Sequence, residues 1–379
     1  MKGTYVVLFL LAINVDKLAG PREAVAARDQ RHRTESAAWT YGGLSCPSVP
    51  CPVDLHMLHS AFVHMVVGTE HASALPLLVH RVCDFSKQCV GRSNMRIVLH
   101  NKKTSISRRH REAVSFLQHL NIQPADEWNG TFTADAKMAA SYSALRGLHS
   151  HDTMILQMDV DEEPDPVLFN QALREIEAQK CDAVFAFWQD RLALGGNLSR
   201  VQISSGAPLV EQFPLQCELS AKVVRGGKTA KTIAYRADAR LDGGQHDVWC
   251  DRSGNSGVGG SERWNKTRAC AQHAHDRAKS KLLPLILAHT SNLQARPRFC
   301  RTKVPLRHYK FLHGVEEHLA RRMESYRRLG LHWWRDSRLF LEHLRRHGGR
   351  VCVECAGMGC VDTRTGQPVR ESLEESSFS

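Results

Sequence analysis

Short apolar runs alternate with stretches of helical periodicity from about residue 55 to residue 187. The apolar runs predict buried strands, and the stretches with apolar residues at every third or fourth position predict helices. The predicted strands cover residues 61–67, 95–99, 153–158 and 183–187, and the predicted helices cover residues 77–82, 109–120, 134–148 and 168–180. Because alternating strands and helices indicate βαβ units, we expect an α/β fold with a mostly parallel sheet flanked by helices.

The pattern changes after residue 190. Residues 190–300 are less regular, and a glycine-rich stretch at residues 251–260 favours a surface insertion over a loop that closes on a substrate. That stretch lacks the Lys-Ser/Thr ending of a P-loop, so the pattern gives it no phosphate-binding role. Helical spacing returns between Val315 and Tyr326 and again between Leu339 and Leu344, which predicts a C-terminal helical segment.

Composition excludes several classes of protein. The 379 residues are 42% hydrophobic and 24% charged, as in a globular protein, which excludes a wholly disordered or collagen-like chain. No apolar run reaches the roughly 18 residues of a membrane span, which excludes a multi-pass membrane protein. Lys and Arg (51) exceed Asp and Glu (39) by 12, so we expect an anionic partner. Charge alone does not tell whether that partner is nucleic acid, a membrane surface or a phosphorylated small molecule.

The N-terminus has the order of a secretory signal. Met1-Lys2 precedes an apolar stretch at residues 5–15 and small residues at Ala19-Gly20. We therefore expect a signal peptide or short signal anchor over residues 1–20, with membrane association through that segment, although a buried N-terminal strand is the alternative. A polar stem or linker is predicted for residues 21–54, followed by one catalytic domain over residues 55–350. The expected location is the Golgi or ER lumen, or secretion.

Twelve cysteines support the same compartment. In an oxidising lumen they predict a partial disulfide framework whose pairing the sequence does not give. The competing interpretation of Cys352, Cys355 and Cys360 is a zinc site, but structural zinc normally uses two closely spaced ligand pairs and only one is present here. Three Asn-x-Ser/Thr sequons, at Asn129, Asn197 and Asn265, add mild support. Residues 351–379 are expected to form a cysteine-containing segment and, from residue 361, a disordered tail.

The acids at Asp159-Val160-Asp161-Glu162 follow an apolar strand. Side chains at i and i+2 of a strand share a face, so Asp159 and Asp161 are predicted to meet one divalent cation beyond the carboxyl end of the strand. Oxygen ligands favour Mn²⁺ or Mg²⁺, and such an ion can stabilise the departing diphosphate of a nucleotide-sugar. The alternative is an ordinary acidic turn after a strand.

Three segments resemble glycosyltransferases of family 2 and family 92 type. They are Met154-Ile-Leu-Gln-Met-Asp-Val-Asp-Glu162, the Lys-bearing stretch Lys231–Tyr235 with a later His246, and Leu306-Arg-His-Tyr-Lys-Phe311. Their order is that of the family, and the resemblance covers roughly residues 55–350. It implies a GT-A-like, Rossmann-type fold and transfer of a sugar, with inversion, from a nucleotide-sugar donor to a glycan or glycoconjugate acceptor.

The resemblance also implies site residues. Asp159 and Asp161 would hold the metal and the donor diphosphate, His308 would be a third metal ligand, and Lys310 a phosphate contact. A neutral imidazole can bind a cation, and an ammonium group offsets diphosphate charge. The first strand would end at the nucleobase pocket, near Gly68, Thr69 and Glu70. Lys231 and His246 are weaker candidates.

An inverting transfer also needs a carboxylate that accepts the proton of the acceptor hydroxyl. The candidate acids downstream of the metal motif are Asp190, Glu211, Glu218, Asp242 and Asp247, and Asp247 is preferred because it adjoins His246 and precedes the glycine-rich stretch. Two other functions stay open. One is a catalytically inactive, disulfide-linked secreted binding module on the same fold, and the other is a basic nucleic-acid-binding protein, which the secretory features oppose. The sequence does not give the sugar, the acceptor, the anomer or the oligomeric state.

Overall fold

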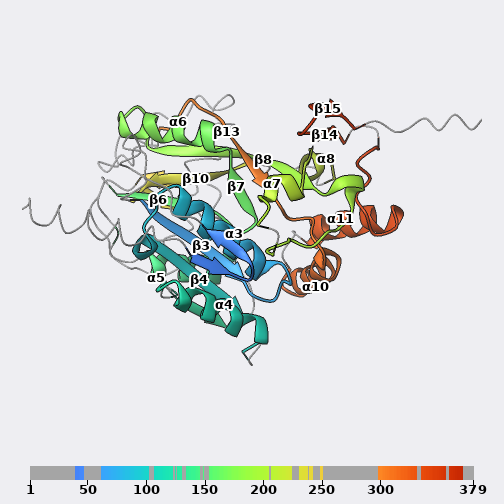
Figure 1. Cartoon of the computed structure of the whole chain (residues 1–379), viewed down its shortest axis with the longest axis horizontal. Helices are drawn as coiled ribbons and strands as arrows, with labels where there is room; N and C mark the ends of the chain where they lie inside the picture. Colours follow the sequence, from blue (N-terminus) through green and yellow to red (C-terminus); the bar gives the residue numbers. More distant parts are fainter. Residues whose placement is uncertain are drawn as a thin grey trace, which may run out of the picture.

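A computed structural model describes most of the region between residues 39 and 369 (Figure 1). The described residues are 39–46, 61–101, 106–122, 124, 126–129, 134–145, 148, 153–204, 206–223, 230–237, 239–241, 248–250, 298–330, 334–355 and 358–369. The predicted signal segment, the glycine-rich stretch, His246 and Asp247 lie outside them. Within these residues, no helix combines the length and the apolar character that a membrane crossing requires.

One half of the central sheet is parallel. It holds four neighbouring strands, in the order β6, β3, β4, β5: β3 (Phe62–Gly68), β4 (Met95–Asn101), β5 (Asp126–Asn129) and β6 (Met154–Gln157). β3 pairs in parallel with both β4 and β6. The parallel pairs agree with the buried apolar runs of the sequence, since strands covered on both faces need no polar alternation.

The other half of the sheet is largely antiparallel. β10 (Ala230–Arg236) pairs antiparallel with β6 on one side and with β8 (Ala183–Leu192) on the other. β9 (Leu215–Cys217), β14 (Val361–Asp362) and β15 (Gln367–Pro368) continue the sheet beyond β8. β13 (Val304–His308) runs parallel to β8 and antiparallel to β7 (Glu162–Pro164). The prediction of a mostly parallel sheet is thus corrected to a mixed sheet, because residues after 190 insert antiparallel strands.

Helices surround the sheet, and α10 and α11 lie side by side at one end of the molecule (Figure 1). Local sequence sets where α6 begins. Pro166 is the first residue of this helix, and the preceding Asp165 caps it by accepting a hydrogen bond from the Leu168 N–H at 3.1 Å. The helices are α3 (Ala74–Lys87), α4 (Arg108–His119), α5 (Ala134–Ala144), α6 (Pro166–Glu177), α7 (Leu209–Gln212), α8 (Leu219–Val223), α10 (Val315–Arg328) and α11 (Trp334–Arg346). The predicted α/β class with flanking helices and a C-terminal helical segment is confirmed.

The core has two main parts. The larger packs strands β3, β4 and β6 against α3, α4 and α6, with Phe116 and Phe169 fully buried. Burying a side chain of that size contributes about 1.5–3 kcal/mol to stability. A second cluster packs α10 and α11 against β8, β9 and the segment around Val351 and Val353. The C-terminal helices are thereby attached to the sheet beside the end of β8.

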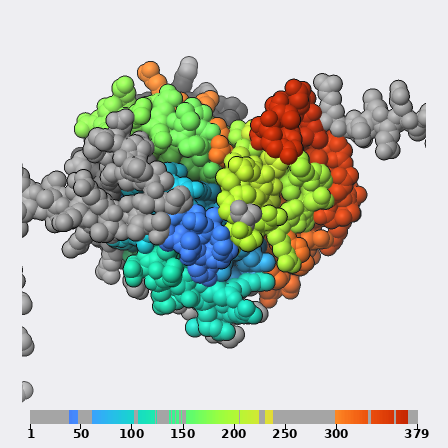
Figure 2. All heavy atoms as spheres, viewed as in Figure 1, coloured from blue at the N-terminus to red at the C-terminus, as the bar shows by residue number. Residues whose placement is uncertain are grey.

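Two expectations about the ends of the domain are wrong in part. Residues 39–46, predicted to be linker, form a hairpin of β1 (Trp39–Tyr41) and β2 (Leu44–Cys46) whose Trp39 and Leu44 join the core. Residues 361–369, predicted to be disordered, include the β14–β15 hairpin, which pairs with β9. Figure 2 shows this C-terminal segment (red) against the yellow-green surface of residues near 200.

Four disulfides occur among the described residues, so the expected disulfide framework is present there. They join Cys46 to Cys83, Cys181 to Cys300, Cys217 to Cys360 and Cys352 to Cys355. Further short elements in the described residues are η1 (Arg92–Asn94), η2 (Leu194–Gly196), β11 (Ala239–Leu241) and β12 (Val248–Cys250).

Candidate functional site

The acidic motif lies in a turn directly after β6. The strand ends at Gln157, and the Glu162 N–H donates to the Asp159 carbonyl at 3.1 Å, which closes the turn. The expectation that Asp159 and Asp161 share the face of a strand is therefore wrong, because the extended backbone stops before either of them. The turn still stands at the carboxyl end of β6, where ligands bind in open α/β sheets.

Asp159 is neutralised by two lysines of the chain itself. Its Oδ1 lies 2.9 Å from Lys137 Nζ on α5, and its Oδ2 lies 3.1 Å from Lys231 Nζ on β10. Burial alone would raise the pKa of Asp159, but the two ammonium groups outweigh burial and hold the pKa well below its ordinary range. Asp159 is thus charged, and both of its oxygens are engaged.

Glu162 forms the buried base of the same network. Its Oε2 lies 2.7 Å from Lys231 Nζ and accepts the Asp159 N–H at 2.8 Å, while its Oε1 accepts from Trp188 Nε1 at 2.9 Å. Burial alone would lower the pKa of Lys231, but the charges of Asp159 and Glu162 raise it above its ordinary value. Lys231 is therefore a buried cation between two carboxylates, a stronger position than the sequence assigned to it.

Asp161 faces a histidine from the far end of the chain. His308 Nε2 lies 3.6 Å from Asp161 Oδ2, and His308 Nδ1 lies 2.9 Å from Asp190 Oδ1. Asp190 accepts two further hydrogen bonds from Ser220, through its N–H at 2.5 Å and its hydroxyl at 2.8 Å. Because Asp190 is fixed in this way, it orients the imidazole and directs Nε2 towards Asp161.

An aromatic ring and nearby acids also fix the position and the charge of His308. The indole ring of Trp188 stacks on the imidazole, with ring centroids 5.0 Å apart and planes 12° apart. Burial alone would lower the pKa of His308, but its hydrogen bond with Asp190 and the charge of Asp161 raise it above the ordinary value. The ring is held rigidly in an acidic setting that favours a cation on or beside Nε2.

Lys310 lies near this acidic pair without forming an ion pair in the described part of the chain. Its Nζ stands 5.7 Å from the centre of the Phe340 ring on α11. Burial lowers the pKa of Lys310 to about 8, and the charge of Arg322 acts in the same direction. A half-buried ammonium group without a carboxylate of its own is suited to bind an anionic ligand.

The predicted nucleobase pocket lies at the end of β3. A Cβ built on Gly68 would meet no atom of the described residues within 4 Å, so that part of the chain leaves open space beside Gly68. The Thr69 hydroxyl is already used, since it donates to the His100 carbonyl at 3.0 Å. Glu70 Oε1 is buried and accepts no hydrogen bond from the described residues.

His71 connects the end of β3 with the Lys310 side of the site. Its ring lies 3.8 Å, centroid to centroid, from that of His318 on α10. Burial lowers the pKa of His71 to about 4, and the charges of Arg321 and Lys310 act in the same direction. The contact between His71 and His318 thus joins the end of β3 to α10.

Sequence reasoning named Asp161, His308 and Lys310 but gave no role to Lys137, Trp188 or Ser220. These three contribute only through tertiary contacts, and no local motif marks them. Asp190 stood only among several candidate bases; the structure makes it the partner of His308. The candidate base Asp247 lies outside the described residues.

The sequence matches no protein-family model and no curated protein. Among solved structures, it aligns with S. aureus TarS 1-349 at 13% identity and a TM-score of 0.27, over 47% of each chain. The complex of TarS 1-349 with UDP gives the same values, and the complex with UDP-GlcNAc gives 12% identity and a TM-score of 0.24 over 40% of this chain and 46% of TarS. The matched part spans less than half of the TarS chain, and similarity at this level assigns no function.

Proposed function

We propose that this protein is a cation-dependent glycosyltransferase that moves a sugar from a nucleotide-sugar donor to a glycan or glycoconjugate acceptor. The observation that carries the proposal is the arrangement Asp190–His308–Asp161, with Lys310 beside it. A carboxylate that orients a histidine, whose other nitrogen faces a second carboxylate, is a common arrangement at metal centres.

The residues fit a divalent cation. With Nδ1 bonded to Asp190, His308 presents Nε2 as a lone pair, and Asp161 presents a carboxylate oxygen 3.6 Å away. Mixed oxygen and imidazole ligands suit Mn²⁺, and Mg²⁺ is the alternative. Bound there, the cation would supply charge stabilisation for the leaving diphosphate. Asp161 and His308 are the proposed ligands. Asp159 ranks after them, because a cation would first have to displace Lys137 or Lys231 from it.

The remaining polar groups match the other parts of a nucleotide-sugar. The ammonium group of Lys310 would contact the diphosphate. The negative charge of the diphosphate would compensate for the water that the half-buried ammonium group has lost. Glu70 Oε1 would accept a hydrogen bond from a ribose hydroxyl or base N–H, and the space beside Gly68 leaves room for the base. Inversion at the anomeric carbon and a carboxylate base, with Asp247 the candidate, remain part of the proposal.

We also propose the cellular compartment of this protein. Disulfides form and persist in oxidising compartments, and the four disulfides support a secretory-pathway lumen or secretion. Membrane association through the N-terminal segment remains a prediction.

The test is donor-induced thermal protection. The wild-type protein is heated with a panel of nucleotide-sugars, beginning with UDP-GlcNAc, with and without Mn²⁺ or Mg²⁺. We expect protection by at least one donor only with the cation, and Asp161→Asn should abolish that protection. Asp362→Asn, which changes a carboxylate on the β14–β15 hairpin, is the matched control and should behave as wild type. Full protection of Asp161→Asn would show that the site is wrongly assigned.

One observation favours the second candidate, an inactive binding module. Lys137 and Lys231 already neutralise Asp159, so this acid of the motif needs no bound metal ion to balance its charge. Cation-dependent hydrolysis of a nucleotide-sugar separates the two functions, since an inactive module would bind the donor without releasing the sugar.

A further inference from the structure

Two histidines and two cysteines lie close together where α11 ends. The order is His343-x3-His347-x4-Cys352-x2-Cys355. His343 lies in the last turn of α11 and His347 directly follows the helix, so the two histidines form one ligand pair, and the two cysteines form another. Pairs of this spacing, two imidazoles and two thiolates, are a ligand set of structural zinc.

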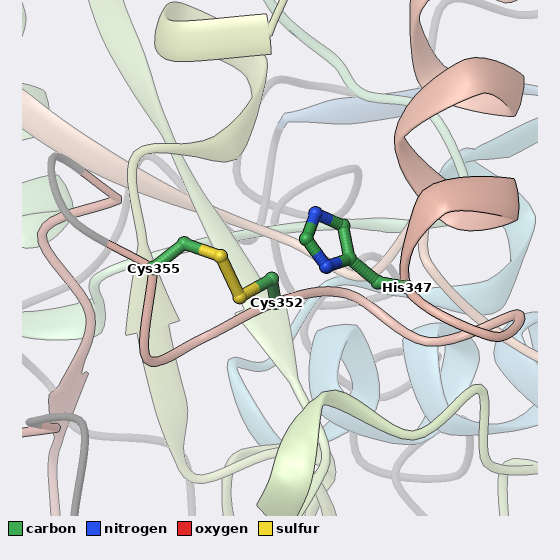
Figure 3. Close-up of side chains that lie close together, drawn as sticks. All are labelled: His347, Cys352 and Cys355. Atoms are coloured by element: carbon green, nitrogen blue, oxygen red, sulfur yellow. A yellow bond between two sulfur atoms is a disulfide. The ribbon is translucent and has the colours of Figure 1, made fainter. Parts of the chain in front are cut away.

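The structure brings these pairs together. A ring nitrogen of His347 and the Sγ atoms of Cys352 and Cys355 all lie within 4.8 Å of one another, and Figure 3 shows the imidazole beside the disulfide. The His343 ring lies 4.7 Å from that of His347, centroid to centroid, and its Nε2 is 3.3 Å from the Cys352 N–H. His343 therefore lies beside this group, and its Nε2 would have to release the Cys352 N–H before it could bind the same ion.

The backbone holds this arrangement in place. Gly348 and Gly349 have φ of +63° and +80°, which side-chain-bearing residues rarely adopt, and they reverse the chain after α11. Val351 then donates its N–H to the Gly196 carbonyl at 2.9 Å, and its side chain is buried. The cysteine segment is thus anchored on both sides of Cys352 by the core, with Val353 also buried.

The Cys352–Cys355 bond differs from the other disulfides in what it can contribute. It joins residues three apart, whereas Cys217–Cys360 closes a separation of 143 residues. Loop-closure entropy grows with loop length, so the short bridge constrains the unfolded chain least. Cys360 is held in a separate disulfide to Cys217, so a reductant that opens only the short bridge would free Cys352 and Cys355 and leave Cys360 joined.

We propose that Cys352 and Cys355, when reduced, bind a zinc ion together with His347 and His343. A dithiol reductant breaks the S–S bond, gives two electrons and becomes a disulfide itself; the two cysteine thiols then lose two protons as Zn²⁺ binds. The two thiolates balance the charge of the ion, so no acidic residue is needed. The disulfide leaves no thiolate to bind the ion, so zinc would bind only the reduced form. This inference does not depend on the proposed function.

The experiment is a zinc titration of the full chain before and after mild reduction. Differential alkylation and peptide mass spectrometry identify preparations in which Cys352 and Cys355 are free while Cys217 and Cys360 remain joined. Zinc is then titrated in competition with a chromogenic chelator. We expect reduction to add one bound zinc ion per chain to what the oxidised protein binds, since the proposed ligands Asp161 and His308 are the same in both forms.

Variants separate the site from other zinc-binding groups. His347→Ala should weaken zinc binding about 10-fold or more, His343→Ala should also weaken it, and His313→Ala, on an exposed residue, should leave it unchanged. Each variant is first melted in the oxidised form, where wild-type behaviour shows that it is folded. Absence of zinc binding by the reduced chain, or unchanged affinity in folded His347→Ala, would overturn the proposal.

Discussion

Asp159 and Asp161 lie two residues apart in one turn, yet the structure gives them opposite surroundings. Asp159 contacts two ammonium groups from α5 and β10, and its charge is balanced within the chain. Asp161 faces the imidazole of His308, and no lysine or arginine forms an ion pair with it among the described residues. The first acid is part of the protein's internal structure, and the second is left for a ligand. Adjacency in an acidic motif therefore does not imply a shared role.

The largest expected effect is a loss of stability when the charges around Asp159 are removed. Lys231→Met should reduce the free energy of unfolding by about 3–5 kcal/mol, because it leaves Glu162 buried and Asp159 with only one cation. Urea unfolding followed by circular dichroism measures the change. Lys137→Met is the comparison and should cost less, since Lys137 is more exposed and contacts Asp159 alone. Equal losses in the two variants would contradict a central position for Lys231.

The second effect is a loss of cation affinity at Asp161 and His308. Asp190→Asn should weaken cation affinity by about 10- to 100-fold, because an amide no longer fixes His308 with Nε2 facing Asp161. The measurement is the cation concentration needed for half-maximal donor protection. Ser220→Ala, which removes one hydrogen bond from Asp190 and leaves the backbone N–H bond, should shift that concentration less. A purely structural Asp190 would lower thermal stability without moving the cation requirement.

The smallest effect is a pH dependence next to the Lys137–Asp159 pair. His64 is buried, with Nδ1 2.9 Å from the Arg96 carbonyl and Nε2 2.9 Å from the Ser141 hydroxyl, and burial lowers its pKa to about 4. The unfolded chain, with a histidine pKa near 6.5, takes up more protons between these values, so stability falls as pH decreases.

Between pH 7 and pH 5 this loss should be about 1–2 kcal/mol. It is measured as the slope of unfolding free energy against pH. His64→Gln keeps polar contacts with both partners but does not titrate, so its slope should be shallower. An identical slope in both proteins would show that His64 does not carry the dependence.

Strong local patterns made the parallel half of the fold predictable. Continuous apolar runs gave β3, β4 and β6, and apolar stripes gave α4, α10 and α11. Most of the antiparallel half was missed, apart from residues 183–187 of β8, because strands such as β13 and β9 are short and gain stability only from partners far along the chain. The β1–β2 hairpin was missed for the same reason: three-residue strands carry too little pattern to stand out from a linker.

The site divides in a similar way. Asp161, His308 and Lys310 stand in short segments that resemble known motifs, so the sequence pointed to them. The part of Asp190 could not be inferred, because it follows from the parallel register in which His308 of β13 lies opposite Asp190 of β8, 118 residues earlier. The ion pair between Lys137 and Asp159 could not be inferred either, because it depends on how α5 packs on β3, β4 and β5.

The position of β13 between β7 and β8 sets a limit on how this protein can change over evolutionary time. One strand aligns His308 with Asp190 on one side and with Glu162, beside Asp161, on the other. A slip of a single position would turn the imidazole to the opposite face of the sheet and away from both acids. A change of length within these five residues should therefore eliminate the site in one step.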